Sequence, residues 1–191
     1  MADITGSAGL DTIKAPLFRE VKKGEVRKHV LTLTVRNELG VLARIATLIA
    51  GKGYNIEGLS VGETHEKGIS RMTLEVIGDD VVIDQVVKQL RKLIDSLKVK
   101  DLTDTPHVER ELALIKVHTA TPRARDEVLR LVQIFRAKVV DVSPETYTVE
   151  ITGAEDKISA FIDLVRPFGI KEMARTGKVA MKREGTPQEE E

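Results

Sequence analysis

Apolar and polar residues follow two different periods along the first half of the chain. Over residues 29–36 aliphatic residues alternate with threonines, which is the period of a half-buried strand. Residues 41–52 instead repeat their aliphatic side chains every three to four positions, as in a helix packed on a sheet. The same periods predict strands at 29–36, 55–63, 69–77 and 97–103 and helices at 41–52 and 81–95.

The order of predicted elements repeats in the second half. Thr105-Pro106-His107 interrupts the first pattern, and a helix then opens at Thr121-Pro122 with proline in its first turn. Each half reads strand, helix, strand, strand, helix, strand, which is the split βαβ or ferredoxin-like arrangement. The remaining predicted elements are strands at 109–118, 138–143 and 146–152, a helix at 154–166 and at least one strand within 170–182.

The predicted fold class is therefore α+β, with two ferredoxin-like βαββαβ units in tandem. The first unit takes residues 28–105 and the second takes residues 106–183. An N-terminal arm of residues 1–27 precedes them, and a disordered acidic tail of residues 184–191 follows. Each unit is small for a core of its own, so we expect the two to pack on each other or on a partner.

The composition excludes several classes of protein. The chain of 191 residues has no Cys, so disulfide scaffolds, Cys-based zinc sites and thiol catalysis are excluded. The 30 Lys and Arg balance the 30 Asp and Glu, and the central strands carry no aromatic residue for stacking bases, so we expect no nucleic acid to bind. No signal peptide and no apolar run of roughly 20 residues is present, and we expect a cytoplasmic protein without membrane contact.

Catalytic and metal-binding patterns are also missing from the sequence. The four histidines are scattered, without the spacing of a metal site. Asp79-Asp80 and Glu155-Asp156 both precede predicted helices, where acids complement the helix dipole. We see no acid–base pair among these carboxylates.

The second unit is the more basic one, with 14 Lys and Arg against 11 Asp and Glu over residues 106–183. A solvated helix face explains this excess most simply. The alternative is a docking surface for an acidic protein partner. The residues concerned are Arg123, Arg125, Arg130, Arg136 and Lys138.

Residues 37–56 contain the candidate ligand site. Asn37 and Gly40 lie between the first strand and the first helix, and Asn55 and Ile56 open the next strand. A helix N-terminus with free N–H groups beside an Asn side chain suits a small carboxylate ligand. The alternative is a plain strand–helix turn, in which Gly40 serves the backbone and Asn37 caps the helix or makes an Asx turn.

Three segments of the sequence resemble a known family. They are RNELGVLARIATLIAGKGYNIEGLSVG at 36–62, ISRMTLEV at 69–76 and HVERELALIKV at 107–117. The first resembles the ACT domain, a ligand-binding module of amino-acid metabolism. Together with shorter matches through Ala174-Arg175-Thr176-Gly177, they resemble the regulatory (small) subunits of acetolactate synthase, also called acetohydroxyacid synthase, over roughly residues 28–183.

This resemblance implies a regulatory function without chemistry in the chain itself. Subunits of that family bind the thiamine-diphosphate-dependent catalytic (large) subunit, raise its activity and make it sensitive to valine. The reaction joins two pyruvates, or pyruvate and 2-oxobutyrate, on the way to the branched-chain amino acids. The chain would hold no cofactor, and thiamine diphosphate, Mg and FAD would be bound by the catalytic subunit.

The resemblance also implies where the effector binds. ACT domains of this type pair side by side as a homodimer, and effectors bind at the seam. The valine carboxylate would contact N–H groups at the helix start, and its isopropyl group would lie between Leu42 and Ile56. Leucine or isoleucine would fit as well, because a methylene changes such binding by only about 1–3 kcal/mol. One chain would supply Asn37, Gly40, Val41 and Leu42, and the other Asn55 and Ile56.

Two other functions remain open from the sequence. One is a free-standing ACT regulator that binds an amino acid and acts on another enzyme or a transcription factor. The other is a small ferredoxin-fold enzyme, for which no residues offer support.

In the second unit Thr121-Pro122-Arg123 stands where the first unit has its Asn-Glu-x-Gly turn. Proline lacks an N–H group, so we expect effector sites in the first unit only.

Overall fold

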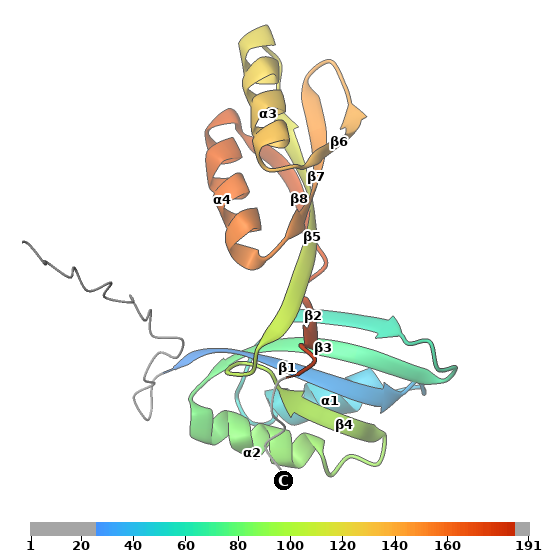
Figure 1. Ribbon diagram of the computed structural model, residues 1–191. Coiled ribbons are helices and arrows are strands. Elements are labelled where there is room, and N and C mark those ends of the chain that lie inside the picture. Colours follow the sequence, from blue (N-terminus) through green and yellow to red (C-terminus); the bar gives the residue numbers. More distant parts are fainter. Residues whose placement is uncertain (1–25, 186–191) are drawn as a thin grey trace, which may run out of the picture.

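The computed structural model describes residues 26–185 as two α+β units joined end to end (Figure 1). Of the predicted N-terminal arm, all but Val26 and Arg27 lies outside the described residues, as does the acidic tail beyond Gly185. The first unit consists of β1 (Arg27–Arg36), α1 (Val41–Ala50), β2 (Ile56–Glu63), β3 (Ile69–Gly78), α2 (Asp80–Leu90) and β4 (Ser96–Asp101).

The second half of the chain repeats this order. Its elements are β5 (His107–His118), α3 (Pro122–Ile134), β6 (Lys138–Val142), β7 (Thr146–Gly153), α4 (Glu155–Val165), a 3₁₀ turn (Arg166–Phe168), β8 (Ile170–Arg175) and β9 (Val179–Lys182). The strand orders are β2-β3-β1-β4 and β6-β7-β5-β8, which is the same order in both units. All strand pairs are antiparallel. The prediction of two tandem ferredoxin-like units is confirmed.

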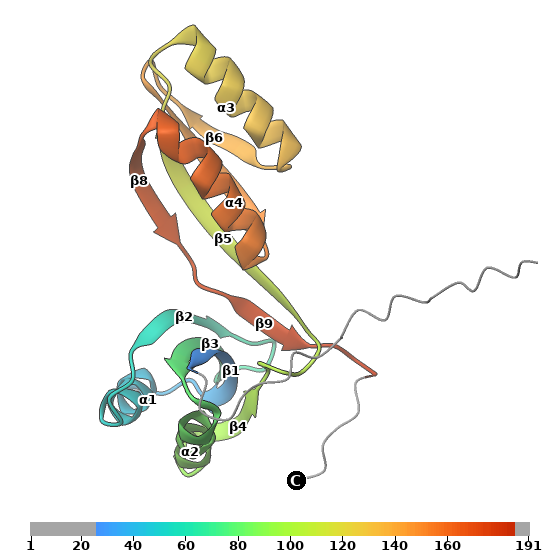
Figure 2. The same cartoon turned by 90° about the vertical axis from the view of Figure 1, so that its left-hand side faces the viewer.

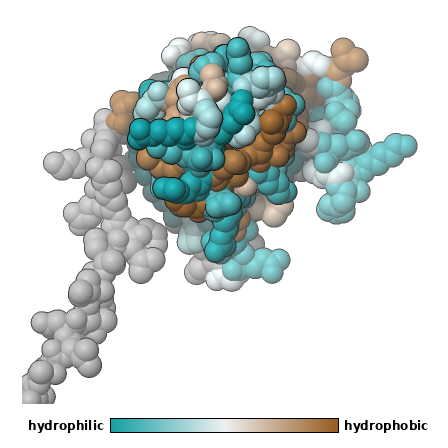
Figure 3. All heavy atoms as spheres, turned by 90° about the horizontal axis from the view of Figure 1, so that it is seen from above, coloured by the Kyte–Doolittle hydropathy of each residue, from teal (hydrophilic) through white to brown (hydrophobic). Residues whose placement is uncertain are grey.

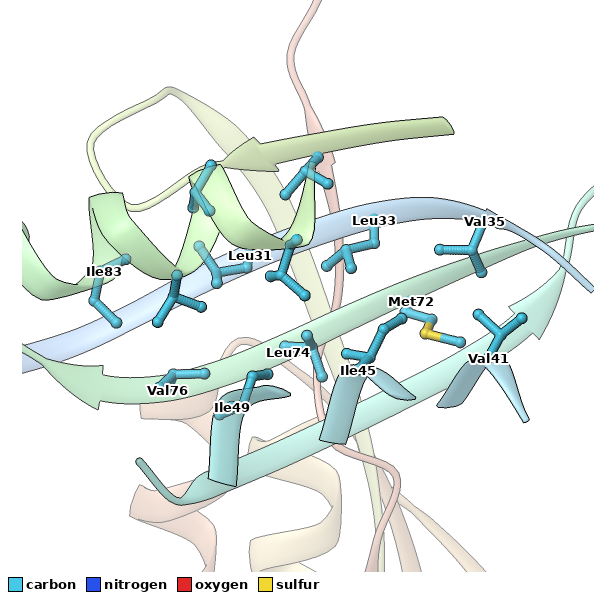
Figure 4. Close-up of a cluster of buried hydrophobic side chains, with 14 residues drawn as sticks. Leu31, Leu33, Val35, Val41, Ile45, Ile49, Met72, Leu74, Val76 and Ile83 are labelled. Atoms are coloured by element: carbon cyan, nitrogen blue, oxygen red, sulfur yellow. The ribbon is translucent and has the colours of Figure 1, made fainter. Parts of the chain in front are cut away.

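Each sheet buries one face beneath its own two helices (Figures 1 and 2). In the first unit the alternation of β1 places Leu31 and Leu33 opposite Leu74 and Met72 of β3. Ile45 of α1 packs on this layer, and all of these side chains are at most 3% exposed (Figure 4). Burial of each such aliphatic side chain contributes about 1.5–3 kcal/mol before conformational entropy is counted.

The second core has the same construction. One face of α4 is buried against β5 and β7, and it consists of Ile158, Phe161, Ile162 and Val165. Phe161 also meets Phe135, at the end of α3, edge to face, with ring centroids 5.4 Å apart.

The second helix of the first unit is shorter than predicted. It ends at Leu90 rather than at residue 95, because the N–H groups of Lys92 and Leu93 turn back to carbonyls three residues earlier. Asp79 caps its start by accepting the N–H of Val82 at 2.9 Å. The helix buries Ile83, Val86, Val87 and Leu90, while Val82 is only half-buried.

The outer face of the first sheet is covered by the last strand of the chain. Residues 170–182 form two strands, and the second of them, β9, pairs with the first residues of β5. Figure 2 shows β9 lying beside the first sheet, where Ala180 joins a small apolar cluster with Val30 and Leu102. Thr32 is therefore 4% exposed, and the prediction of a half-buried first strand is wrong at this position.

Candidate functional site

The turn between β1 and α1 is shaped by a glycine in the left-handed region. Gly40 is the N-cap residue of α1, with φ 84° and ψ −4°. The N–H of Asn37 donates to the carbonyl of Gly68 at 2.8 Å, which fixes the end of β1 against the β2–β3 turn. No side chain caps α1, so Asn37 does not serve as its cap. The Asn37 side chain makes no hydrogen bond to any other residue in the range 26–185.

The N-terminus of α1 differs from the other three α-helix starts in the described part of the chain. Asp79 caps α2, Thr121 caps α3, and α4 has Glu155 and Asp156 in its first turn. Helix α1 has neither a side-chain cap nor an acidic residue there. The N–H of Val41 donates to the carbonyl of Glu38 at 3.4 Å, and the remaining first-turn N–H groups and the positive end of the helix dipole are available to an external anion.

Arg44, which the sequence analysis missed, adds a positive charge at the same turn. Its Nε and Nη2 donate to Oδ2 of Asp95, which is 5% exposed. A Cβ built on Gly40 would lie 3.2 Å from Nη1 of Arg44. The four-residue spacing on α1 could have indicated this arginine, whereas its anchor Asp95 is 51 residues away along the chain.

The two other predicted residues of α1 contribute in different ways. The side chain of Val41 is only 3% exposed and belongs to the core, so Val41 presents no side chain to a ligand. Leu42 is 42% exposed, and the neighbouring Leu39 is fully exposed. This turn is therefore uncovered apolar surface in a single chain.

Asn55 and Ile56 lie at the other end of α1. Because ten helical residues span roughly 15 Å, a single chain does not bring them to the Asn37–Gly40 turn. Asn55 is exposed, and its Nδ2 donates to Glu57 at 3.0 Å. Ile56 is half-buried and packs partly on the core of its own unit. It opens β2, which is an edge strand of the first sheet.

The sequence and structure match one known family in both units. A model of the small subunit of acetolactate synthase matches residues 110–184, and a model of the ACT domain of acetohydroxyacid synthase small subunits matches residues 31–98. The acetolactate synthase small subunit of Aquifex aeolicus is 75% identical over 191 residues, which cover 100% of this chain and 99% of the relative. The chain belongs to the acetolactate synthase small-subunit family.

Other members of the acetolactate synthase small-subunit family agree with this assignment. A probable small subunit from Archaeoglobus fulgidus is 56% identical over 156 residues, covering 82% of this chain and 97% of the relative. The crystal structure of the small subunit from Thermotoga maritima superposes with a TM-score of 0.74 at 44% identity, covering 82% of this chain and 98% of that one. The first unit of this chain is an ACT domain.

The two units of this chain meet around a buried lysine. Lys178, between β8 and β9, is 6% exposed and lies 3.4 Å from Glu75 of β3, 3.2 Å from Glu109 of β5 and 2.7 Å from Glu155 of α4. Lys28 of β1 also contacts Glu75 and Glu155, at 3.4 Å and 2.6 Å. The cluster thus joins the sheet of the first unit to a helix of the second.

Electrostatics stabilise the charged forms in this cluster. Burial raises the pKa of Glu155, but hydrogen bonds from Lys178 and Lys28 outweigh it and lower the pKa to about 2. Burial lowers the pKa of Lys178, but the hydrogen bond to Glu155 and the attraction of Glu75 and Glu109 raise it above its ordinary value.

Strand β2 lies close to this cluster at Gly58, and the connection between β8 and β9 lies close to β2 at Gly177. A Cβ on Gly58 would lie 2.5 Å from Oε1 of Glu75, and a Cβ on Gly177 would lie 3.2 Å from the carbonyl oxygen of Leu59. The edge strand that carries Ile56 is therefore in direct contact with the connection between β8 and β9.

The basic residues of the second unit are partly structural. Arg125 donates to the carbonyls of Thr119 and Pro144, which ties together two loops. Arg123 pairs with Glu127 one turn along α3. These contacts favour the interpretation of a helix face over that of a docking surface at these two positions. Viewed from the end of this unit, the surface is mostly hydrophilic, with a band of hydrophobic side chains (Figure 3).

Within residues 26–185 no group of three or more His, Asp or Glu side chains could hold a metal ion. In the same range no helix is long and apolar enough to cross a membrane.

Proposed function

We propose that this chain is the regulatory subunit of acetolactate synthase. It binds and activates the thiamine-diphosphate-dependent catalytic subunit in the cytoplasm and confers feedback inhibition by valine, without catalysing a step itself. Thiamine diphosphate, Mg and FAD belong to the catalytic subunit in this proposal. The observation that carries it is the uncapped helix start at Gly40, with Asn37 and Arg44 beside it, in an ACT domain of this family.

The effector site is proposed to be completed by a second copy of the chain. Strand β2 is an edge strand, and its backbone groups on that side can pair with another β2. Such a homodimer joins two four-stranded sheets and brings Asn55 and Ile56 of one protomer to Asn37 and Leu42 of its partner. The ACT unit, residues 28–105, would thus serve both effector binding and dimerisation.

Valine fits the groups available at this site. Its carboxylate is matched by the first-turn N–H groups of α1. The amide side chains of Asn37 and Asn55 offer both donors and acceptors to the two polar ends of an amino acid. Leu42 and Ile56 provide a small apolar surface for the isopropyl group, on which leucine or isoleucine would also bind.

The bound state reaches the catalytic subunit through the second unit, residues 106–183, in this proposal. Strand β2 at the effector seam contacts Glu75 and the backbone around Gly177, and Lys178 then links Glu75 to Glu155 of α4. A coupling free energy of about 1–3 kcal/mol between effector and catalytic subunit is sufficient for ordinary feedback inhibition.

Reconstitution tests the proposed function. The purified chain is mixed with the catalytic subunit, and acetolactate formation is measured with and without valine. We expect the chain to raise the activity, valine to lower it again, and the chain alone to have none. A chain that neither associates with the catalytic subunit nor changes its activity would contradict the proposal and favour the free-standing amino-acid sensor.

Mixed dimers test the shared pocket. Asn55→Ala removes a polar partner and little apolar area, so we expect weaker valine binding with an unchanged fold. A dimer that combines one Asn37→Ala chain with one Asn55→Ala chain should retain one intact pocket of two, as measured by calorimetric stoichiometry. Chains that carry both changes should retain none. Equal loss in the two kinds of dimer would count against a site built from two chains.

A further inference from the structure

One nitrogen of the Arg44 guanidinium lies at the effector turn while the others are already held. Nε and Nη2 donate to Oδ2 of Asp95 at 2.9 Å and 2.5 Å. Nη1 lies beside Gly40, where a Cβ would be 3.2 Å away. Within the described residues, Nη1 makes no hydrogen bond. The guanidinium thus has an unused donor at the turn.

Asp95 fixes the position of this guanidinium. Its side chain is buried, and its carbonyl oxygen accepts the N–H of Arg36 at 3.0 Å, so the residue contacts both the end of β1 and the side of α1. A buried carboxylate requires such a charged partner. Because Asp95 already orders the Arg44 side chain, a ligand that binds it loses little further side-chain entropy.

The first helix of the second unit also has an arginine one turn after its N-cap residue, but a side chain caps that helix. Arg125 lies four residues after the N-cap of α3, as Arg44 does after the N-cap of α1. Arg125, however, donates to two backbone carbonyls, and Thr121 caps its helix. Both arginines are therefore held through Nε and Nη2, Arg125 by loop carbonyls and Arg44 by a carboxylate. The helix start is capped by a side chain in the second unit and uncapped in the first.

We propose that Arg44 binds the carboxylate of the effector and thereby selects α-amino acids over analogues without that charge. The inference rests on the proposed function, because it concerns the same effector site. One carboxylate oxygen accepts from the first-turn N–H groups of α1, and the other accepts from Nη1 of Arg44. Asp95 is a positioning residue. Charge-assisted hydrogen bonds from Arg to a carboxylate are among the stronger polar contacts in proteins.

Calorimetry with valine and valinamide tests this role. Valinamide keeps the amine and the isopropyl group but lacks the carboxylate charge. We expect the full-length wild-type chain to prefer valine, and Arg44→Gln to weaken valine binding by about 10- to 100-fold while leaving valinamide binding unchanged. Arg44→Lys has one side-chain nitrogen, which Asp95 occupies, so it should also lose most of the preference. Arg123→Gln, the same change in the first turn of α3, is the matched control and should bind like the wild type.

The outcomes separate this inference from the proposed function. Absence of valine binding to the wild-type chain would remove the valine site and this inference together. Valine binding with an unchanged preference over valinamide in Arg44→Gln, or in Arg44→Lys if the first variant does not fold by circular dichroism, would overturn the role of Arg44 alone. Equal affinity of the wild-type chain for the two ligands would do the same.

Discussion

Gly40→Asp is expected to abolish valine inhibition of the holoenzyme while activation of the catalytic subunit survives. Gly40 has φ 84°, and a Cβ there would lie 3.2 Å from Nη1 of Arg44. The new carboxylate would pair with Arg44 and lie over the first-turn N–H groups of α1, where the effector carboxylate is proposed to bind. We expect valine affinity to fall by at least about 100-fold, since both polar contacts of the carboxylate are lost. Titration of holoenzyme activity with valine measures the effect.

Gly40→Asn separates the charge from the shape. Asn has nearly the same size as Asp and tolerates the same positive φ, but it carries no charge. We expect Gly40→Asn to retain more valine sensitivity than Gly40→Asp. Full valine sensitivity in Gly40→Asp would show that the pocket is elsewhere. Equal loss in both variants would assign the effect to bulk rather than to the carboxylate.

Lys178→Met is expected to destabilise the protein by about 3 kcal/mol at pH 7, because it removes the buried cation from three carboxylates. Lys178 contacts Glu75, Glu109 and Glu155 within 3.4 Å. Lys28 remains beside two of them, so the loss of stability should not exceed about 3 kcal/mol. Denaturant unfolding of the two proteins measures the difference.

The pH dependence of this difference follows from the shifted pKa values. The pKa of Glu155 is lowered to about 2 from 4.5, so its stabilisation is present above 4.5 and is lost as the pH falls through about 2. The pKa of Lys178 is raised from 10.5, so its contribution is present below 10.5 and is lost as the pH rises through the raised value. The difference in the free energy of unfolding between wild type and Lys178→Met should therefore become smaller at very low and at very high pH.

Lys116→Met is the matched control for Lys178→Met. Lys116 pairs with Glu172 at 2.7 Å on the surface of the second sheet, and exposed pairs of this kind contribute little. We expect no measurable change in the free energy of unfolding. If Lys178→Met proves as stable as this control at pH 7, the buried cluster does not hold the two units together.

The order of elements and both cores could be predicted from the sequence, because they depend on local periodicity. Aliphatic residues at period 2 or 3.6 must bury one face, whatever the rest of the chain does. The turn at Asn37–Gly40 could also be predicted from local sequence, because a glycine between a strand and a helix indicates a special backbone geometry. The helix end at Leu90 was not predicted, because the N–H groups of Lys92 and Leu93 bond to carbonyls three residues earlier, a change that the apolar period does not mark.

Only the tertiary structure decided how the units meet and what surrounds the effector turn. Asp95 reaches Arg44 across 51 residues, and Lys178 contacts carboxylates of β3, β5 and α4. Strand β9 covers the outer face of β1, so a threonine that alternation assigns to solvent is buried. The local pattern of apolar residues determines which side chains face a sheet's own helices. What covers the opposite face of the sheet, and which distant charges pair, depends on how segments far apart in the sequence come together in the fold.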